Sequence, residues 1–448
     1  MRFPRRLHAL TACAAVVTAM TGCAGDESPE PGDSLPSVVR LYGTDGTMQN
    51  AFADHLADPS ILSGMKGTTP LTDLSPVFTN RLLKIDPSLE GFNYAGETYD
   101  AIAIAAIAAE LAGTPDPERV RLYIKGVTAG GQPCDTVAKC LDLARDGEDL
   151  QYRGVALRQG GFTEAGEPAV ATYGTQHFGP DGRIDPAKTE FMGAGDPGAT
   201  TTEEPPEPGP RPQGPEWEIE PLRIGTLLPQ TGDLSFAYPP LRAAAALAVA
   251  DINDAGGVFG VDVERLEGDD GTRPEVAKET VADQIEAGVH VIIGAAASQV
   301  TAAVLPDVVA AKRILFTPAS TAHDLMNLEH DGYLFRTAPS DLLQGAALAD
   351  MILRDGVARV AVISRQDAYG DGLRDNTVEA LRRFGVPMGD IIQLSYPVVD
   401  DPSQPIPGLD ELVARVVRDE PEGILIIGFA ESAQIIQALA DAGVPITR

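Results

Sequence analysis

The chain has 448 residues, and 44% of them are apolar, which is enough for two compact lobes of roughly 150–200 residues each. Its 65 Asp and Glu residues outnumber 34 Lys and Arg residues, so the formal net charge is −31. Because phosphate groups repel such a surface and no basic cluster follows the N-terminal leader, nucleic acid is excluded as an expected partner.

Residues 1–22 have the form of a secretory leader, with three arginines before an apolar core that is too short for a permanent membrane anchor. The sequence MTGC at residues 20–23 resembles a bacterial lipobox, which implies cleavage before Cys23 and lipidation of that residue. Residues 23–37 are polar and rich in proline and acid, as expected of a lipid tether. We therefore expect an exported protein, lipid-anchored in the cell envelope at a periplasm-facing membrane and touching the membrane only through its lipid.

Two cysteines remain once Cys13 has left with the leader and Cys23 carries the lipid. Cys134 and Cys140 lie close together in the sequence, and in an exported protein a local disulfide is the expected state. The sequence contains no CxxC, HExxH or histidine cluster, so neither a metal site nor another cofactor is expected.

The first half of the chain contains one long helix between shorter elements. Residues 38–46 read as a strand that ends in a loop with Asp45. A helix is predicted from Tyr94 to Leu111, and its alanine-rich surface must be buried. Strands are predicted over 150–156 and 170–178.

The composition changes at residues 191–221, which are rich in Pro, Gly and Glu and are predicted to be a linker between the two halves. Beyond it, strands and helices alternate to the end of the chain. After an opening strand, the elements expected outside residues 289–321 are the helix 240–253, the strand 359–364, the helix 373–384, the strand 423–427 and the helix 431–442.

The central unit of the second half is a strand at 289–295, a helix at 299–311 and a strand at 313–317. Both strands are apolar without alternation, which is typical of parallel strands covered on both faces. The loops that follow them meet at the edge where open α/β sheets bind ligands. Those loops carry Ser298, Ala319, Ser320 and Thr321. The N-terminus of a helix at Ser298 suits a carboxylate, although a serine there is more often only an N-cap and Ser-Thr after a strand often only a turn.

Residues 222–448 resemble the N-terminal two thirds of a type I periplasmic binding protein, in the branch of leucine/isoleucine/valine-binding proteins and related receptor domains. Residues 38–190 resemble the C-terminal third of the same family. The segments that carry the resemblance are LPQTGDL, AVADINDAGGVFG, GDDGTRPEVA, IIGAAAS, FTPASTAHDL, FRTAPSD and DAYGDGL in the second part, and LYGTDGTM, GTTP and YAGETYDAIAIAA in the first. The resemblance implies an α/β fold of two Rossmann-like lobes with parallel sheets and a ligand cleft between them.

The two parts occur in reversed order, so the chain looks like a circular permutant whose linker joins the family's original ends. This predicts that Arg448 lies beside residues 35–38. One lobe would contain 222–340 and 68–140, and the other 341–448, 38–67 and 141–190. An exchange of the two parts between two chains remains the alternative.

The resemblance also implies roles for individual residues. Ser298 and Thr321 match positions that hold the α-carboxylate and ammonium of an amino acid, helped by backbone groups of Ala319. Asp45 matches the acid that binds the ligand ammonium, and Tyr369 the aromatic side chain that faces the ligand. Other expected pocket residues are Ser320, Phe429 and Tyr238. Family members commonly have a tyrosine or similar group where this chain has Ala237, and a shift of the alignment by one residue would place Tyr238 there.

The function implied is capture of a small amino acid, branched-chain or otherwise aliphatic, for an ABC permease, by a protein expected to be a monomer. The alternative is a ligand-sensing protein without a transport role. An enzyme is not expected: Asp269 and Asp270 are paired carboxylates, but no nucleophile, metal set or phosphate loop accompanies them.

Overall fold

The computed structural model describes residues 38–210, 219–399 and 401–446, which belong to one compact unit. The expected leader, the lipidation site Cys23 and the tether lie outside the described residues. Within the described ranges, every helix is too short or too polar to cross a membrane.

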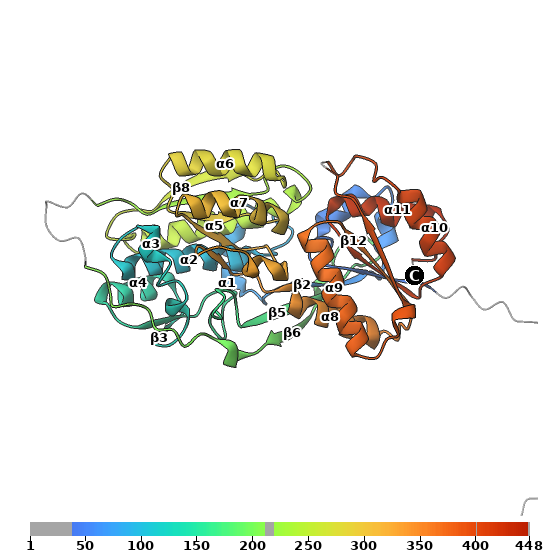
Figure 1. Cartoon of the computed structure of the whole chain (residues 1–448), viewed down its shortest axis with the longest axis horizontal. Coiled ribbons are helices and arrows are strands. Elements are labelled where there is room, and N and C mark those ends of the chain that lie inside the picture. Colours follow the sequence, from blue (N-terminus) through green and yellow to red (C-terminus); the bar gives the residue numbers. More distant parts are fainter. Residues whose placement is uncertain (1–37, 211–218, 400, 447–448) are drawn as a thin grey trace, which may run out of the picture. The chain divides into compact units, whose positions relative to one another are not determined.

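The first lobe is built on a five-stranded parallel sheet in the order β11-β10-β9-β7-β8. The two strands predicted from unalternated apolar runs, β9 and β10, are buried along their whole length, as expected for a sheet covered on both faces. Helices α2 and α5 cover one face, and α6 and α7 cover the other (Figure 1). The elements are β7 (Arg223–Leu228), α5 (Tyr238–Asp254), β8 (Glu264–Asp269), α6 (Pro274–Glu286), β9 (Val291–Gly294), α7 (Ser298–Ala310), β10 (Ile314–Thr317) and β11 (Leu334–Arg336).

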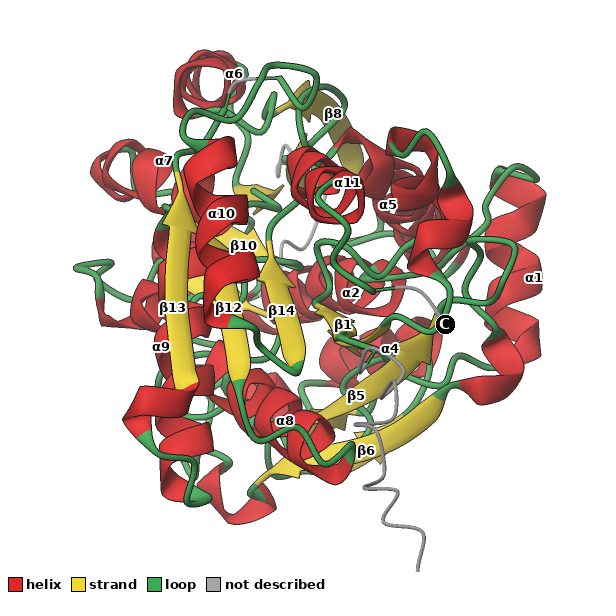
Figure 2. Cartoon of the chain, turned by 90° about the vertical axis from the view of Figure 1, so that its right-hand side faces the viewer, coloured by secondary structure: helices red, strands yellow, loops and turns green. Residues whose placement is uncertain are grey.

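The second lobe is built on a seven-stranded sheet in the order β13-β12-β14-β1-β2-β5-β6, in which β5 alone runs opposite to the other strands. Figure 2 shows β13, β12 and β14 side by side with β1 next in line. Its elements are β1 (Arg40–Gly43), β2 (Lys66–Pro70), β5 (Val170–His177), β6 (Glu190–Gly195), α8 (Asp341–Arg354), β12 (Val360–Arg365), α9 (Ala368–Arg383), β13 (Ile391–Tyr396), α10 (Leu409–Asp419), β14 (Gly423–Ile427) and α11 (Ala433–Asp441). The predicted α/β fold with two sheet-based lobes is confirmed.

The smaller elements between residues 76 and 152 pack on the first lobe, so residues 141–162 belong there and not, as predicted, to the second lobe. The cause is the side chains of α4 and of Phe162, which share one apolar core with β7 and β10. These elements are α1 (Pro76–Ile85), α2 (Ala95–Ala112), α3 (Pro117–Val120), β3 (Gln132–Cys134), α4 (Val137–Asp146) and β4 (Leu150–Tyr152). Short 3-10 helices occur at Asn50–His55, Pro59–Leu62, Gly126–Thr128, Pro186–Lys188, Pro197–Ala199, Ser235–Ala237, His323–Asn327, Met388–Asp390 and Ala430–Ser432.

Helix α2 is buried at all eighteen of its positions, because its alanine and isoleucine side chains give it no polar face. It ends at Gly113, which adopts a left-handed conformation with a φ of 68°. Inside the helix, Asp100 accepts hydrogen bonds from the backbone N–H groups of residues 155–157 and from the Tyr152 hydroxyl. This carboxylate holds residues 153–157 as a loop, so β4 stops at Tyr152 and not at the predicted residue 156.

The two ends of the described chain meet in the second sheet. β1 lies between β14 and β2, and the Val39 N–H donates to the Pro445 carbonyl at 2.9 Å. The segment after α11 therefore lies beside the start of β1. Arg448 and residues 35–37, for which the contact was predicted, lie outside the described residues.

The predicted linker is more ordered than expected. Its first residues are part of β6, which pairs with β5, so its expected start at residue 191 is corrected to follow Gly195. Beyond that point the chain crosses the first lobe: Gly209 N–H donates to the Leu111 carbonyl at 3.0 Å, and the Tyr123 hydroxyl donates to the Glu207 carbonyl at 2.7 Å. Free carbonyl groups at the end of α2 give the proline-rich segment a place to bind.

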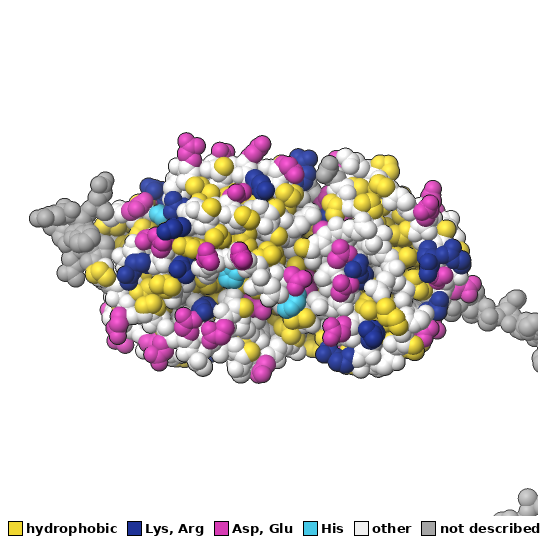
Figure 3. All heavy atoms as spheres, viewed as in Figure 1, with side chains coloured by type: hydrophobic (Ala, Val, Ile, Leu, Met, Phe, Trp, Pro, Cys, Tyr) yellow, Lys and Arg dark blue, Asp and Glu magenta, His cyan; other side chains and the backbone are white. Residues whose placement is uncertain are grey.

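Surface charge is mixed on the face seen in Figure 3, where Asp and Glu side chains are spread among the Lys and Arg side chains. Among the described residues, no group of three His, Cys, Asp or Glu side chains is arranged to hold a metal ion.

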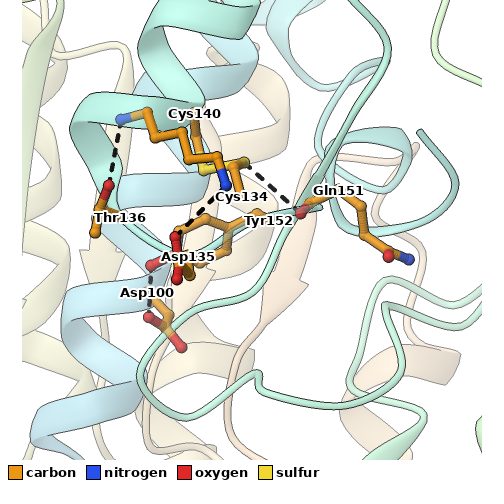
Figure 4. Close-up of a disulfide and its surroundings, with 8 residues drawn as sticks. Asp100, Cys134, Asp135, Thr136, Cys140, Gln151 and Tyr152 are labelled. Atoms are coloured by element: carbon orange, nitrogen blue, oxygen red, sulfur yellow. Dashed lines mark hydrogen bonds and ion pairs between the residues drawn. A yellow bond between two sulfur atoms is a disulfide. The ribbon is translucent and has the colours of Figure 1, made fainter. Parts of the chain in front are cut away.

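The predicted disulfide is present between Cys134 and Cys140, whose Cα atoms are 5.4 Å apart. Both cysteines are buried, at the end of β3 and within α4 (Figure 4). Beside them, Thr136 caps α4 by accepting the Lys139 N–H at 3.3 Å. The bond closes a short loop that ties α4 to β3.

Replacing both cysteines with serine should lower the free energy of unfolding by about 2 kcal/mol, because a short closed loop removes little entropy from the unfolded chain. Chemical denaturation of the two proteins measures the difference. As a control, a reducing agent should destabilise the parent and leave the Cys134→Ser/Cys140→Ser variant unchanged. Equal stability of parent and variant would contradict a structural role for the bond.

Candidate functional site

The carboxyl ends of strands from both sheets face a small pocket between the lobes. The first lobe contributes the loops after β7, β9 and β10, and the second lobe the loops after β1, β12 and β14. Open parallel sheets place ligands at this edge. The lining residues are Asp45, Gly46, Gln49, Tyr94, Leu234, Ala237, Leu241, Ala296, Ala297, Ser298, Ala319, Thr321, Tyr369 and Phe429.

The start of α7 forms one wall. Ala297 is the N-cap and makes no side-chain capping bond, so Ser298 is the first residue inside the helix and not the cap. The Ser298 hydroxyl instead accepts the Ala322 N–H at 3.2 Å. The first N–H groups of a helix have no acceptor within it, and the helix dipole makes this end partly positive. This wall suits a carboxylate.

Ser320 lies beneath the pocket and is absent from its lining. Its hydroxyl is fully buried, 2.8 Å from the Thr301 hydroxyl, and donates toward the carbonyl groups of Ala295 and Ala296 at 3.0 and 3.1 Å. Ser320 therefore ties the loop after β10 to the loop after β9. Its neighbours Ala319 and Thr321 do line the pocket.

Asp45 is the acidic group of the pocket and is held by three neutral donors. Its carboxylate accepts hydrogen bonds at 2.9 Å from Gln344 Nε2 and from the hydroxyls of Tyr369 and Tyr94. Burial raises its pKa above the usual 3.8, although the three donors act in the opposite direction. Among the described residues no Lys, Arg or His forms an ion pair with it within 4.0 Å. A buried carboxylate of this kind favours a cationic partner.

A second buried acid lies behind the pocket. Asp341, the first residue of α8, donates its backbone N–H to the Thr321 carbonyl at 2.9 Å. Burial and the neighbouring Asp45 raise the pKa of Asp341 well above the usual 3.8. The charge of Asp45 therefore disfavours ionisation of Asp341.

Aromatic side chains form the second-lobe wall. Tyr369 and Phe429 are stacked with ring centres 5.4 Å apart and an interplanar angle of 17°. The Arg365 guanidinium lies 3.9 Å from the centre of the Phe429 ring on its other side. Tyr94 enters from the start of α2 in a left-handed conformation with a φ of 59°. This strained position points to a role for Tyr94 beyond packing.

Arg365 is also the centre of a buried charge network. Its guanidinium, fully buried, pairs with Glu431 at 3.0 Å and Asp367 at 2.6 Å from the same lobe. It lies 3.7 Å from Asp233, which belongs to the first lobe and precedes the pocket residue Leu234. This ion pair crosses between the lobes.

Replacing Asp233 with asparagine should weaken ligand binding about tenfold, mainly through faster dissociation, because the closed state loses a buried ion pair that the open state does not contain. Stopped-flow dissociation of a bound ligand measures the effect. Asp283→Asn, an exposed change on α6, is the matched control and should leave the rate unchanged. An unchanged rate in the Asp233 variant would contradict the role of this pair in closure.

The paired Asp269 and Asp270 hold loops of the first lobe. Asp269 accepts from the hydroxyl and N–H of Thr231 at 2.6 and 3.1 Å. Asp270 accepts from the N–H groups of Thr272 and Ala296 at 2.7 and 3.3 Å, and burial raises its pKa to about 7. Asp270 therefore positions the pocket loop at Ala296, and Asp269 positions the loop at Thr231.

The structure brings together six of the eight expected site residues and leaves out Ser320 and Tyr238. Tyr238 opens α5 and is only partly buried, while Ala237 beside it lines the pocket. Sequence reasoning missed the pocket role of Tyr94 and the contact of Gln344 with Asp45. Tyr94 stood out at the start of a long helix, and Gln344 gave no local signal.

Comparison with known proteins gives the following matches. The sequence model of the family described as periplasmic binding protein matches residues 221–447. Leu/Ile/Val-binding protein homolog 3 of Brucella melitensis is 29% identical over 230 residues, which cover 50% of this chain and 58% of that protein. An amino acid binding protein of Pseudomonas aeruginosa is 34% identical over 168 residues, 36% of this chain and 44% of that protein. The crystal structure of a leucine binding protein from Thermotoga maritima is 23% identical with a TM-score of 0.44, covering 50% of this chain and 61% of that one. The chain thus spans about half the length of the curated relatives it matches.

Proposed function

Because the chain belongs to the type I periplasmic binding proteins, we propose that it captures a free amino acid by closing its two lobes around the pocket. The ligand class proposed is a branched-chain or other aliphatic amino acid. We also propose that the protein is exported, anchored through Cys23, and delivers its ligand to an ABC permease.

The observation that carries this proposal is the surroundings of Asp45. Its carboxylate is buried, takes hydrogen bonds from Gln344, Tyr369 and Tyr94, and lies opposite the N-terminus of α7. An α-amino acid has a positive and a negative group on one carbon atom. The ammonium would pair with Asp45 and the carboxylate with the Ser298 and Thr321 side, so each buried charge gains a partner.

Asp45→Asn should weaken amino acid binding about a hundredfold, because an ammonium loses its charged acceptor. In the parent, affinity should fall as the pH is lowered through the raised pKa of Asp45, since the protonated acid no longer attracts the ammonium. Calorimetric titration at several pH values measures both effects. Asp350→Asn, on the outside of α8, is the control and should bind as the parent does. Tight binding by Asp45→Asn would exclude this acid as the ammonium site.

We further propose that the chain is a circular permutant of its family. Support comes from β1, which lies between β14 and β2, and from the backbone hydrogen bond between Val39 and Pro445. The family match at residues 221–447 covers the second part of the chain, and residues 38–195 supply four strands of the second sheet. A chain with the two parts in the opposite order would have the same contacts.

A further inference from the structure

A second and larger cavity lies beside the pocket. Its volume is about 720 Å³, against about 30 Å³ for the pocket itself. Its apolar walls come from both lobes and are Leu71, Leu74, Leu89, Phe92, Phe191 and Phe236. We refer to this cavity as the side-chain groove.

The pocket and the side-chain groove are adjacent. Gln49 lines both of them, and its side-chain amide donates to the Asp45 carbonyl at 3.3 Å. In two places, residues adjacent in the sequence line different cavities. Asn93 lines the groove and Tyr94 the pocket, and Phe236 lines the groove and Ala237 the pocket. The side chain of Gln49 therefore forms the boundary between the two spaces.

The volumes decide where a ligand side chain can lie. About 30 Å³ is room for roughly two water molecules, so a bound amino acid head leaves no space there for a large side chain. The rings of Tyr369 and Phe429 and the buried Leu241 close the other sides. The route past Gln49 leads to apolar walls, where each additional buried methylene contributes roughly fourfold in affinity.

We propose that the side chain of the ligand enters the side-chain groove, and that the protein accepts amino acids with apolar side chains larger than that of leucine, aromatic ones included. The inference rests on the proposed function, which supplies the site for the ammonium and carboxylate groups. Ala237 contributes because its methyl group leaves open the side of the pocket next to Phe236. Three phenylalanines in the walls favour an aromatic ring, which packs against them edge to face or offset.

The test fills the side-chain groove and leaves unchanged the pocket that would hold the ammonium and carboxylate groups. Gly91 lines the groove, is exposed, and a Cβ atom placed on it meets no atom within 4 Å, so Gly91→Phe can be accommodated. Gly389 is also exposed with no atom within 4 Å of its Cβ position, and it lies in a 3-10 helix of the second lobe outside the groove. Gly389→Phe is therefore the matched control.

Calorimetric titration with L-phenylalanine and L-alanine, on residues 23–448 with Cys23→Ser, gives the result. In the parent, L-phenylalanine should bind at least tenfold more tightly than L-alanine. Gly91→Phe should lose at least tenfold for L-phenylalanine and less than twofold for L-alanine, and Gly389→Phe should change neither.

Three results would overturn the inference while leaving the proposed function intact. They are binding of L-alanine without L-phenylalanine, no effect of Gly91→Phe on L-phenylalanine, and an equal loss for both amino acids in that variant. Failure of the parent to bind L-leucine as well as L-alanine and L-phenylalanine would instead remove the proposed function, and this inference with it.

Discussion

Replacing both Ser298 and Thr321 with alanine should reduce the affinity for an amino acid more than a hundredfold. Both residues line the pocket beside the N-terminus of α7. A hydrogen bond to a charged group contributes about 1.5–3 kcal/mol, and a buried carboxylate that loses two such bonds keeps its desolvation cost. Calorimetric titration of the double variant measures the loss.

The fold should survive this change. The Ser298 hydroxyl accepts one backbone N–H, from Ala322, so the cost to stability is about 1 kcal/mol. Ser63→Ala with Thr114→Ala removes the same two types of hydroxyl away from the pocket and should bind as the parent does. If the Ser298/Thr321 variant bound with parental affinity, the ligand would lie elsewhere.

Residues 222–448 expressed alone should fail to fold, although this part contains the family match. Without residues 38–195, β14 loses its partner β1 and the second sheet keeps three of its seven strands. The first lobe loses α2, whose eighteen residues are all buried. Exposed strand edges and apolar surface of this extent lead to aggregation. Circular dichroism should show no cooperative thermal transition.

Two further proteins make the prediction specific. Coexpression of residues 38–195 with residues 222–448 should restore a cooperative transition. Joining residue 446 directly to residue 39, and deleting the connection 196–221, should give a chain with the reverse order of parts and an affinity within about threefold of the parent. The backbone hydrogen bond between Val39 and Pro445 places the residues to be joined side by side. Cooperative unfolding of residues 222–448 alone would contradict the pairing of the two parts.

The strands and the family were predictable because their signals are local. Apolar runs without alternation located β9 and β10, and β14 was predicted with its exact bounds. Helix α9 begins earlier than predicted, at Ala368, because Asp367 caps it by accepting the Gly370 N–H at 2.8 Å. Such caps depend on one side chain and are easily missed.

The parts of the site that sequence reasoning missed depend on contacts between distant residues. Gln344 lies in the first turn of α8, and only the fold brings its amide to Asp45. Ser320 has the same local signal as Thr321, yet its hydroxyl is directed to the carbonyl groups beneath the pocket. Arg365 ends a buried strand, and its pairing with Asp233 requires both lobes. The spacing of residues along the sequence does not predict contacts between such distant residues.

Thermal unfolding of residues 23–448 with Cys23→Ser, in the presence of each common amino acid at millimolar concentration, tests the central claim most directly. A ligand at a thousand times its dissociation constant stabilises the native state by roughly 4 kcal/mol. The account predicts one cooperative transition that moves upward with apolar amino acids. The stabilisation should fall to about a third when Asp45 is asparagine, because a hundredfold loss of affinity leaves the ligand at about ten times its dissociation constant. A transition that none of the amino acids shifts would contradict an amino acid site in this cleft.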